Sequence, residues 1–324
     1  MILIETEQNS YQDTKMKKIV VTGGSGMVGR YMQELYPEAQ YPSSKELNLL
    51  DAKQVASYLQ QHKPDVVVHL AAAVAGIVDN VDNPLTYFED NILMNFNIVR
   101  ESNQAGVKNF IGISSTCAYP DSFDHIPSFR YPISESDVHY GPPTPTNYGY
   151  GYAKRVLGVH VDVINTTNKH STYCYIYPCN LFGEYDKYEN SKSHFIGALL
   201  KKISDAQKTG SPSIKLLGTG APLRQFIYGE DLAKLIIKMI KTDTYITMNV
   251  APDECFTIDA LARKTLKALN LEHINIEYSG TLDGQYRKDA NNVVLKQTFP
   301  NFKFTPFEKA IKDTYDYITR YNIV

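Results

Sequence analysis

The sequence lacks features that would indicate a membrane protein or a nucleic-acid-binding protein. No apolar run approaches the length of about 18 residues that a membrane-spanning helix needs. No basic excess exists either, because 33 Lys and Arg residues stand against 35 Asp and Glu residues, for a formal net charge of −2. Since nucleic-acid-binding proteins usually carry a basic excess, we expect neither a membrane nor a nucleic acid as partner. Residues 1–16 lack the apolar core of a signal peptide and are expected to form a flexible extension.

Cysteine is also scarce. The four cysteines are Cys117, Cys174, Cys179 and Cys255, and they form neither a CxxC pair nor a metal-ligand spacing. We therefore expect reduced thiols, a cytoplasmic location and no bound metal.

What is present is an alternation of short apolar runs and amphipathic stretches, which is typical of a parallel sheet wound by helices. Strands are expected at 18–21, 39–42, 65–70 and 110–114, and helices at 26–35, 51–61, 85–105, 256–269 and 306–321, with a strand followed by a helix at 226–239. The predicted fold class is therefore α/β: a Rossmann-like doubly wound parallel sheet with a smaller, interleaved C-terminal α/β lobe.

The division into domains is expected to be interleaved. The regular alternation runs to about residue 177, loosens beyond Pro178, and returns near residue 226. We predict a Rossmann-like domain from residues 17–177 plus about 226–243, for which the motifs below indicate the ligand, and a substrate-binding lobe from residues 178–225 and 244–324.

A glycine-rich turn follows the first expected strand. Gly23, Gly26 and Gly29 are spaced GxxGxxG, directly before a helix. Such a turn lets backbone N–H groups and the helix dipole approach a pyrophosphate, so it predicts a dinucleotide site.

The kind of dinucleotide is indicated about 20 residues further on. NAD sites usually place an acidic residue there, whereas this chain has Ser43, Ser44 and Lys45. Two hydroxyls and a cation favour a 2′-phosphate, so the expected cofactor is NADP(H). Asp51 is a candidate partner for the adenine amine.

A tyrosine and a lysine form the candidate catalytic pair. Tyr150 and Lys154 are four residues apart at the start of an expected helix, so their side chains share one face. An ammonium nearby is expected to lower the pKa of the phenol and to let it exchange a proton with a carbonyl oxygen. Ser115 or Thr116, at the end of an expected strand, can hold the same oxygen. Together these groups indicate a carbonyl–alcohol oxidoreductase.

From about Lys17 to the C-terminus the chain resembles the GDP-L-fucose synthase family of extended short-chain dehydrogenases. The stretches that carry this resemblance are GGSGMVG, ELNLLD, HLAAAVAGI, SSTCAYP, the YxxxK pair, NLFGEYD with SHFIGALLKK, GTGAPLRQFIY, DGQYRK and FTPFEKAI. The resemblance implies NADPH-dependent conversion of GDP-4-keto-6-deoxy-D-mannose to GDP-L-fucose by 3,5-epimerisation and 4-keto reduction.

The resemblance also implies roles for individual residues. Ser115, Tyr150 and Lys154 match the reductase group, and Cys117 and His194 match the pair that moves protons during epimerisation. The residues expected to contact substrate are Asn180, His194, Lys202, Arg224 and Lys288. The residues expected to contact cofactor are Gly23, Ser25, Gly26, Met27, Val28, Gly29, Ser44, Lys45, Asp51, Leu70, Ala71, Ala72, Tyr150 and Lys154. Ser25 and Ser44 stand where some relatives have arginines for the 2′-phosphate.

Three alternatives remain at this stage. The first is a GDP-sugar 4-keto reductase without epimerase activity, which would act for instance on a GDP-6-deoxy-heptose. The second is a dehydratase or 4-epimerase, against which Cys117 and Ala118 argue, because a dehydratase would place acidic residues after Thr116. The third is a non-catalytic NADP-binding sensor, against which the retained Tyr–Lys pair argues.

Two helices are expected to be apolar on more than one face and therefore to need cover on both sides. Their apolar residues are Phe88, Ile92, Leu93, Phe96 and Val99 in one helix, and Val156, Leu157, Val159, Val161, Val163 and Ile164 in the other. Pairing of both helices with their copies predicts a homodimer.

Overall fold

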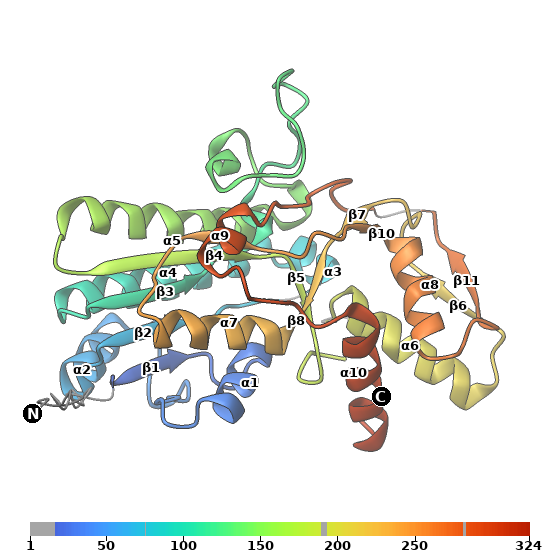
Figure 1. Cartoon of the computed structure of the whole chain (residues 1–324), viewed down its shortest axis with the longest axis horizontal. Helices are drawn as coiled ribbons and strands as arrows, with labels where there is room; N and C mark the ends of the chain where they lie inside the picture. Colours follow the sequence, from blue (N-terminus) through green and yellow to red (C-terminus); the bar gives the residue numbers. More distant parts are fainter. Residues whose placement is uncertain (1–16, 75, 189–192, 281–282) are drawn as a thin grey trace, which may run out of the picture.

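The computed structural model describes residues 17–74, 76–188, 193–280 and 283–324 (Figure 1). The predicted extension at residues 1–16 lies outside the described residues. In the larger part of the molecule, a five-stranded parallel sheet has the order β1-β2-β3-β4-β9. The strands are β1 (Ile19–Thr22), β2 (Val66–His69), β3 (Asn109–Ile113), β4 (Thr172–Pro178) and β9 (Met248–Val250). All residues of β1 and β2 are buried, as expected for strands covered on both faces.

Helices cover both faces of this sheet, which confirms the doubly wound α/β fold (Figure 1). One face is covered by α2 (Ala52–His62), α4 (Pro84–Gln104) and α5 (Tyr148–Thr167). The other is covered by α1 (Met27–Leu35) and α7 (Gly229–Lys241), which pack against each other. A short helix, α3 (Ile77–Asp82), precedes α4.

The smaller lobe lies at the carboxyl ends of the strands, on the right of Figure 1. Its strands pair two by two: β5 (Asn180–Phe182) with β8 (Phe226–Tyr228), β6 (Ser213–Leu216) with β11 (Asn275–Tyr278), and β7 (Leu223–Arg224) with β10 (Phe256–Thr257). Its helices are α6 (Phe195–Thr209), α8 (Ile258–Ala268) and α10 (Phe307–Arg320), whereas α9 (Val293–Thr298) packs against β9 of the main sheet. One buried apolar cluster runs from β1 and β2 into α6, α8 and α10, so the two parts share a core.

The connection between β3 and α5 is long and contains three 3₁₀ turns, η1 (Thr116–Ala118), η2 (Glu135–His139) and η3 (Pro145–Asn147). Its middle section, green in Figure 1, projects away from the sheet. The turn η1 directly follows the carboxyl end of β3, which brings Ser115 and Cys117 to the edge of the sheet where ligands bind.

The predicted strand at 39–42 was wrong. Only Gln40 bridges to β1, through two backbone hydrogen bonds to Val21 and Ile19 of 2.8 and 2.9 Å. Pro42 has no N–H to continue the pairing, and Ser43 then turns the chain by donating from its backbone and hydroxyl to Glu46.

Other predicted elements are confirmed within one or two residues, including α1, α2, α4, α7 and α10. The range 256–269 starts with the short strand β10 before α8 begins. The predicted lobe boundary at residue 244 needs one correction, because β9 (Met248–Val250) pairs with β4 in the main sheet. Within the described residues, no helix is both long and apolar enough to cross a membrane.

Candidate active site

The glycine-rich turn fits tightly against the end of β2. Gly23 has a φ of +77°, and a Cβ on it would lie 2.6 Å from the backbone nitrogen of Ala71. A Cβ on Gly29 would lie 2.3 Å from the carbonyl oxygen of Gly23. Gly26 is the N-cap of α1 and offers no side-chain cap, so the first N–H groups of the helix face the turn. Glycine at these two positions lets the turn pack closely on its own backbone, and the uncapped N–H groups at the start of α1 fit a pyrophosphate.

The other residues predicted to contact the cofactor surround this turn. Ser25 is exposed, and Met27 and Val28 are half-buried in the first turn of α1. Leu70, Ala71 and Ala72 follow β2 and are also half-buried. Their positions at one edge of the sheet agree with a common ligand, and their contacts with a cofactor remain a prediction.

The region predicted to bind the 2′-phosphate contains a carboxylate as well as the predicted cation. Ser44 and Lys45 are exposed in a turn. Glu46 accepts hydrogen bonds of 2.8 Å from the backbone and hydroxyl of Ser43, which places a carboxylate beside the predicted cation. Asp51 caps α2, since its carboxylate accepts from the backbone of Lys53 and of the next residue. This capping role accounts for Asp51 without an adenine contact.

The reductase group lies where the carboxyl end of β3 meets the start of α5. Lys154 is 2% exposed, and its Nζ donates to the carbonyl oxygen of Ile113 at 2.7 Å. The same Nζ lies 5.7 Å from the centre of the Tyr150 ring. The hydroxyl of Ser115 accepts from the backbone N–H of Cys117 at 3.1 Å. The structure therefore brings Ser115, Tyr150 and Lys154 together, as their motifs predicted.

The predicted ionisation of this pair needs a correction. Burial raises the pKa of Tyr150, and the nearby Cys117 thiolate raises it further, whereas the Ser115 hydroxyl lowers it. Burial also lowers the pKa of Lys154 to about 8. The ammonium is held on the Ile113 carbonyl and does not lower the phenol pKa as expected. Tyr150 is thus a neutral phenol at physiological pH, which suits a proton donor.

A buried polar chain that the sequence analysis missed supports the reductase group. His69, fully buried in β2, is hydrogen-bonded to the Thr22 hydroxyl at 2.8 Å and to the Asn95 side chain at 2.9 Å. Asn95 of α4 in turn donates to the carbonyl oxygen of Ala153 at 3.2 Å. Burial lowers the pKa of His69 to about 3, so the imidazole is neutral. The signal in the sequence was a histidine ending the apolar run DVVVHL.

Cys117 lies beside the reductase group and contacts a lysine from a distant segment. The Nζ of Lys288 is 3.2 Å from the Sγ of Cys117. Burial raises the pKa of the thiol, but Lys288, Ser115 and Arg224 outweigh this effect and lower it overall. A thiol with a lowered pKa is a competent base near neutral pH.

His194 is the N-cap of α6 and lies 3.6 Å, Nδ1 to Oδ1, from the carboxylate of Asp186. Burial lowers the pKa of His194, but Asp186 and the Cys117 thiolate raise it above the usual value overall. The raised pKa of His194 favours an acid and the lowered pKa of Cys117 favours a base, and the two groups influence each other electrostatically.

The remaining predicted substrate residues lie around this group without contacting it. Arg224 ends β7 and donates to the Leu223 carbonyl oxygen at 2.8 Å. Asn180 of β5 donates to the Gln225 carbonyl oxygen at 2.8 Å. Lys202 of α6 donates to the Lys215 carbonyl oxygen, about two helical turns from His194. No described hydrogen bond joins Asn180 or Lys202 to the catalytic residues.

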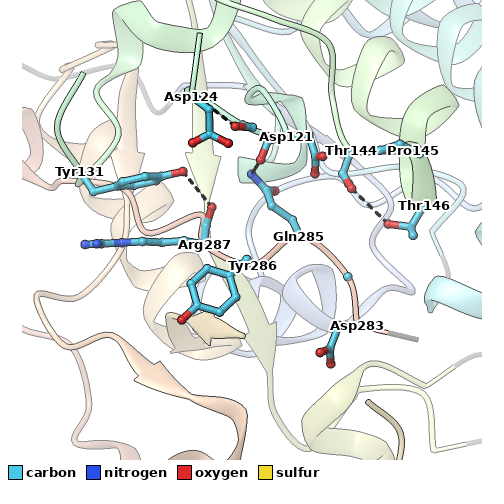
Figure 2. A pocket seen from close by; sticks show the side chains of 12 residues that line it. Asp121, Asp124, Tyr131, Thr144, Pro145, Thr146, Asp283, Gln285, Tyr286 and Arg287 are labelled. Carbon is cyan, nitrogen blue, oxygen red and sulfur yellow. Dashed lines mark hydrogen bonds between the residues drawn. The ribbon is translucent and has the colours of Figure 1, made fainter. Parts of the chain in front are cut away.

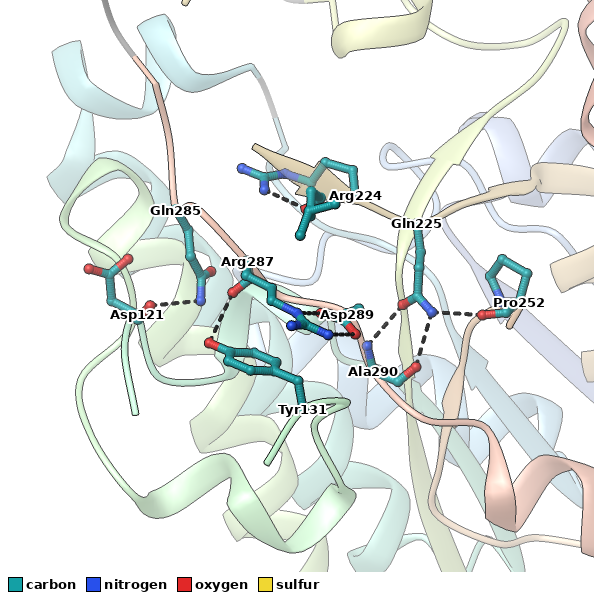
Figure 3. A network of polar contacts seen from close by, with 10 residues as sticks. Asp121, Tyr131, Arg224, Gln225, Pro252, Gln285, Arg287, Asp289 and Ala290 are labelled. Carbon is teal, nitrogen blue, oxygen red and sulfur yellow. Dashed lines mark hydrogen bonds and ion pairs between the residues drawn. The ribbon is translucent and has the colours of Figure 1, made fainter. Parts of the chain in front are cut away.

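The segment that carries Lys288 is held by a polar network (Figure 3). The buried amide of Gln225 donates to Pro252 and Ala290 carbonyl oxygens at 2.7 and 3.1 Å and accepts from the Ala290 N–H at 2.9 Å. Arg287 pairs with Asp289 at 2.6 Å and lies 4.4 Å from the Tyr131 ring centre. Residues on both sides of Lys288 are therefore fixed, and the network explains how a loop holds a cation against Cys117.

A cavity of about 550 Å³ opens beside the same segment (Figure 2). Its lining residues are Asp121, Ser122, Asp124, Tyr131, Thr144, Pro145, Thr146, Asp283, Gly284, Gln285, Tyr286 and Arg287. Residues 144–146 lead into α5 and residues 283–287 lead to Lys288, but neither the Tyr–Lys pair nor Cys117 lines the cavity, so it lies beside the site and is not part of it. Its volume lies in the usual range for small-molecule pockets, about 300–1,000 Å³.

Comparison with known proteins agrees with this geometry. Residues 19–251 match the NAD dependent epimerase/dehydratase family. A probable GDP-L-fucose synthase from Drosophila melanogaster is 34% identical over 313 residues, which cover 91% of this chain and 95% of that protein. A GDP-L-fucose synthase from Dictyostelium discoideum is 32% identical over 316 residues, which cover 94% and 95%.

A solved structure is similar over the same extent. The crystal structure of a GDP-L-fucose synthetase from Naegleria fowleri bound to NADP aligns with a TM-score of 0.81 at 29% identity, covering 96% of each chain. The resemblance inferred from the motifs is thereby confirmed.

Proposed function

The chain belongs to the NAD dependent epimerase/dehydratase family, and we propose that it converts GDP-4-keto-6-deoxy-D-mannose to GDP-L-fucose with NADPH. The observation that carries this proposal is the contact of 3.2 Å between Lys288 and the Cys117 thiol, directly beside Tyr150 and Lys154. A reductase alone needs the tyrosine and lysine. The additional base with a lowered pKa, and a histidine with a raised pKa, supply epimerisation.

NADPH would bind at the glycine-rich turn and would supply the hydride for C4 of the sugar. The turn from Gly23 to Gly29 would hold its pyrophosphate, because the first N–H groups of α1 have no side-chain cap and are free to bind an anion. Lys154 would bind its ribose, and Ser44 and Lys45 would face its 2′-phosphate.

For epimerisation, a ketone at C4 acidifies the hydrogens on C3 and C5. The Cys117 thiolate removes such a hydrogen as a proton, which leaves an enolate, and His194 returns a proton to the opposite face of the ring. The Lys288 ammonium lowers the pKa of the thiol and so favours its ionised form. This step needs a thiolate at Cys117 and an imidazolium at His194, and the surroundings of each residue favour that form.

For reduction, Tyr150 donates its phenolic proton to O4 while hydride reaches C4. Ser115 hydrogen-bonds the same oxygen and aligns it. The raised pKa of Tyr150 keeps the phenol protonated until charge develops on O4. Lys154 is already anchored on the Ile113 carbonyl and positions the start of α5.

Substrate binding is assigned to the smaller lobe. Arg224, with Lys202 further along α6, would hold the diphosphate of the GDP group, and Asn180 would line the cleft between cofactor and sugar. In this arrangement residues 17–177, with about 226–243 and β9, form the cofactor domain, and the remaining residues from 178 onward bind the substrate. Replacing Arg224 by Met should raise KM for the sugar nucleotide without changing the affinity for NADPH, measured by steady-state kinetics and cofactor titration.

One experiment separates this function from a 4-keto reductase without epimerase activity. The enzyme is incubated in deuterated water with NADPH and GDP-4-keto-6-deoxy-D-mannose. The proposed function predicts GDP-L-fucose with deuterium at C3 and C5, read by NMR and mass spectrometry. Cofactor oxidation without deuterium at either carbon would support the plain reductase, and no oxidation at all would support a sensor.

A homodimer is proposed from the surface of α4 and α5. These two helices pack against each other, yet both present large apolar side chains to solvent. The exposed residues are Leu85, Phe88, Leu93, Phe96, Val156, Val159 and Val163. A second copy of the same pair would cover them in a two-fold interface. Light scattering should give a dimer at micromolar concentration, and Phe96→Glu should give a monomer.

A cytoplasmic location is also proposed. The four cysteines are unpaired in the described structure, and Cys117 needs a free thiol to act as a base. Cell fractionation with a tagged chain tests this location.

A further inference from the structure

We propose that Asp186 is a positioning residue of the epimerisation: its buried carboxylate holds the Nδ1 edge of His194, so that the opposite edge of the ring presents its proton to the sugar. The inference rests on the proposed function and adds a residue to it. Asp186 lies in the stretch NLFGEYD, which contributes to the resemblance to the family, but the sequence alone predicts no role for this residue.

The contact joins two segments that the chain brings together at the start of α6. Asp186 is in the loop after β5, where its Oδ1 accepts from the backbone N–H of Lys187 at 2.8 Å. The same Oδ1 lies 3.6 Å from Nδ1 of His194. The Asp186 side chain is only 5% exposed, whereas the His194 side chain is 39% exposed. Since Nδ1 itself is buried, the exposed edge of the ring is the one that carries Nε2.

Each of the two side chains still has one buried atom that needs a partner. Among the described residues, Nδ1 of His194 and the second carboxylate oxygen of Asp186, Oδ2, are buried without a hydrogen bond. A buried carboxylate is costly unless it is paired, and an imidazolium N–H is the nearest donor that can pair with it. A contact of 3.6 Å in a ligand-free site needs to shorten by only about half an ångström to become a hydrogen bond, and catalytic contacts often shorten in this way when substrate binds.

The position of His194 explains why it needs this partner. His194 is the N-cap of α6, and the dipole at a helix N-terminus disfavours a cation. The same dipole favours an anion, and the Asp186 carboxylate lies against this first turn: a Cβ on Gly197 would be 3.5 Å from its Oδ2. The Asp186 carboxylate therefore offsets the effect of the helix on the imidazolium.

The charged groups that face His194 come from two segments. Asp186 and Lys187 belong to the loop before α6, and Cys117 belongs to η1. Burial and Lys187 lower the pKa of His194, whereas Asp186 and the Cys117 thiolate raise it, and the raising effects are larger. A raised pKa favours the imidazolium, which is an acid, so this pairing assigns the proton donor to His194 and the base to Cys117.

The test is Asp186→Asn, which keeps size and removes charge. The pKa of His194 is measured by NMR titration of the full chain labelled on histidine, with His194→Gln to assign the resonance. Deuterium exchange at C3 and C5 of the ketone is measured over the same pH range. We expect the pKa of His194 to fall by about one unit, and exchange at pH 8 to drop about tenfold or more, because the protonated fraction falls by that factor. As the pH rises, Asp186→Asn should lose exchange at a lower pH than the parent does. Asp186→Glu should restore part of the exchange rate.

Asp205→Asn is the matched control, since Asp205 lies on the same helix in an exposed pair with Lys201. It should leave both the titration and the exchange unchanged. Two results would overturn the proposal. One is an unchanged pKa of His194 in Asp186→Asn. The other, measured on the parent protein alone, is a pKa of His194 at or below the usual value for histidine. If the titration shifts as expected but the parent itself exchanges no deuterium, the pairing stands and the epimerase function is wrong.

Discussion

The two halves of the site are built in different ways. The reductase half uses Tyr150 and Lys154, four residues apart on one helix, with the lysine anchored on the central sheet. The epimerase half uses Cys117, His194 and Lys288, which come from three segments spread over both parts of the molecule. The first depends on one helix packing on one strand end. The second depends on loops from the smaller lobe reaching the main sheet. The reductase half should therefore tolerate movement between the parts, whereas the epimerase half should not.

This difference also suggests how the two reactions are kept in order. Lys288 already contacts Cys117 at 3.2 Å, and we expect substrate bound between the parts to bring His194 into line with them, which would complete the epimerase half. Misplacing a base by about an ångström can cost two orders of magnitude in rate. Variants that act on one half alone test the comparison.

The first of these variants breaks the reductase half. Tyr150→Phe removes the phenolic proton that goes to O4 and should lower NADPH oxidation by about 10²–10⁴-fold. Deuterium exchange at C3 and C5 should continue, because Cys117 and His194 are untouched. The absorbance of NADPH gives the first rate and NMR gives the second. Loss of both activities with unchanged circular dichroism would show that the two halves are not separable.

The second variant breaks the epimerase half with an effect of similar size. Cys117→Ser puts a hydroxyl, which does not ionise near neutral pH, in place of a thiol whose pKa is lowered. Exchange at C3 and C5 should fall by about 10²–10⁴-fold. Slow NADPH oxidation should remain, and its product should have an altered configuration because the ketone is not epimerised. Exchange at the parent rate would contradict the role of Cys117 and favour the plain reductase.

The same contrast explains what the sequence could predict. The glycine turn, the Tyr–Lys pair and most helices follow from local spacing, since each is contained in a short stretch. Cys117, His194 and Lys288 are individually ordinary residues, so only the likeness to a family indicated them. Glu46 beside Lys45, the His69–Asn95 chain and the Asp186–His194 contact depend on tertiary packing and had no periodic signal. The raised pKa of Tyr150 was missed because burial, which opposed the expected effect of Lys154, cannot be read from spacing.

A third variant weakens the epimerase half without removing its base. Lys288→Met takes away the ammonium 3.2 Å from the Cys117 thiol and should raise the pKa of that thiol. The thiol acts as a base only when it is ionised, so deuterium exchange is lost as the pH falls through the pKa of Cys117. In Lys288→Met that pKa is higher, so the loss should begin at higher pH than in the parent. We expect a decrease of about tenfold or more at pH 7 and recovery toward pH 9. The pH dependence of iodoacetamide alkylation at Cys117 measures the pKa directly. An unshifted alkylation profile would show that Lys288 does not control the thiol.

A fourth variant disturbs the loop that carries Lys288. Gln225→Leu removes an amide that is 4% exposed and leaves its Ala290 and Pro252 partners without hydrogen bonds. We expect a loss of about 1–3 kcal/mol in the free energy of unfolding. Exchange should fall several-fold more than cofactor oxidation, because Lys288 is less firmly held whereas Lys154 is unaffected. An equal loss of exchange and of cofactor oxidation would show that the network around Gln225 does not act specifically on the epimerase half.

The smallest expected effect concerns the choice of cofactor, which lies outside both halves. Lys45 is exposed beside Glu46, so its contact with a 2′-phosphate would be screened by solvent. Lys45→Glu should weaken binding of NADPH by about two- to fivefold more than binding of NADH, because only NADPH carries that phosphate. Lys53→Glu is the matched control, since Lys53 is an equally exposed lysine at the start of α2, and it should change both affinities alike. Fluorescence titration gives the four dissociation constants. An equal loss for both cofactors in Lys45→Glu would mean that this lysine does not recognise the phosphate, and the preference for NADPH would then have to arise at the exposed N-terminal turn of α1 around Ser25.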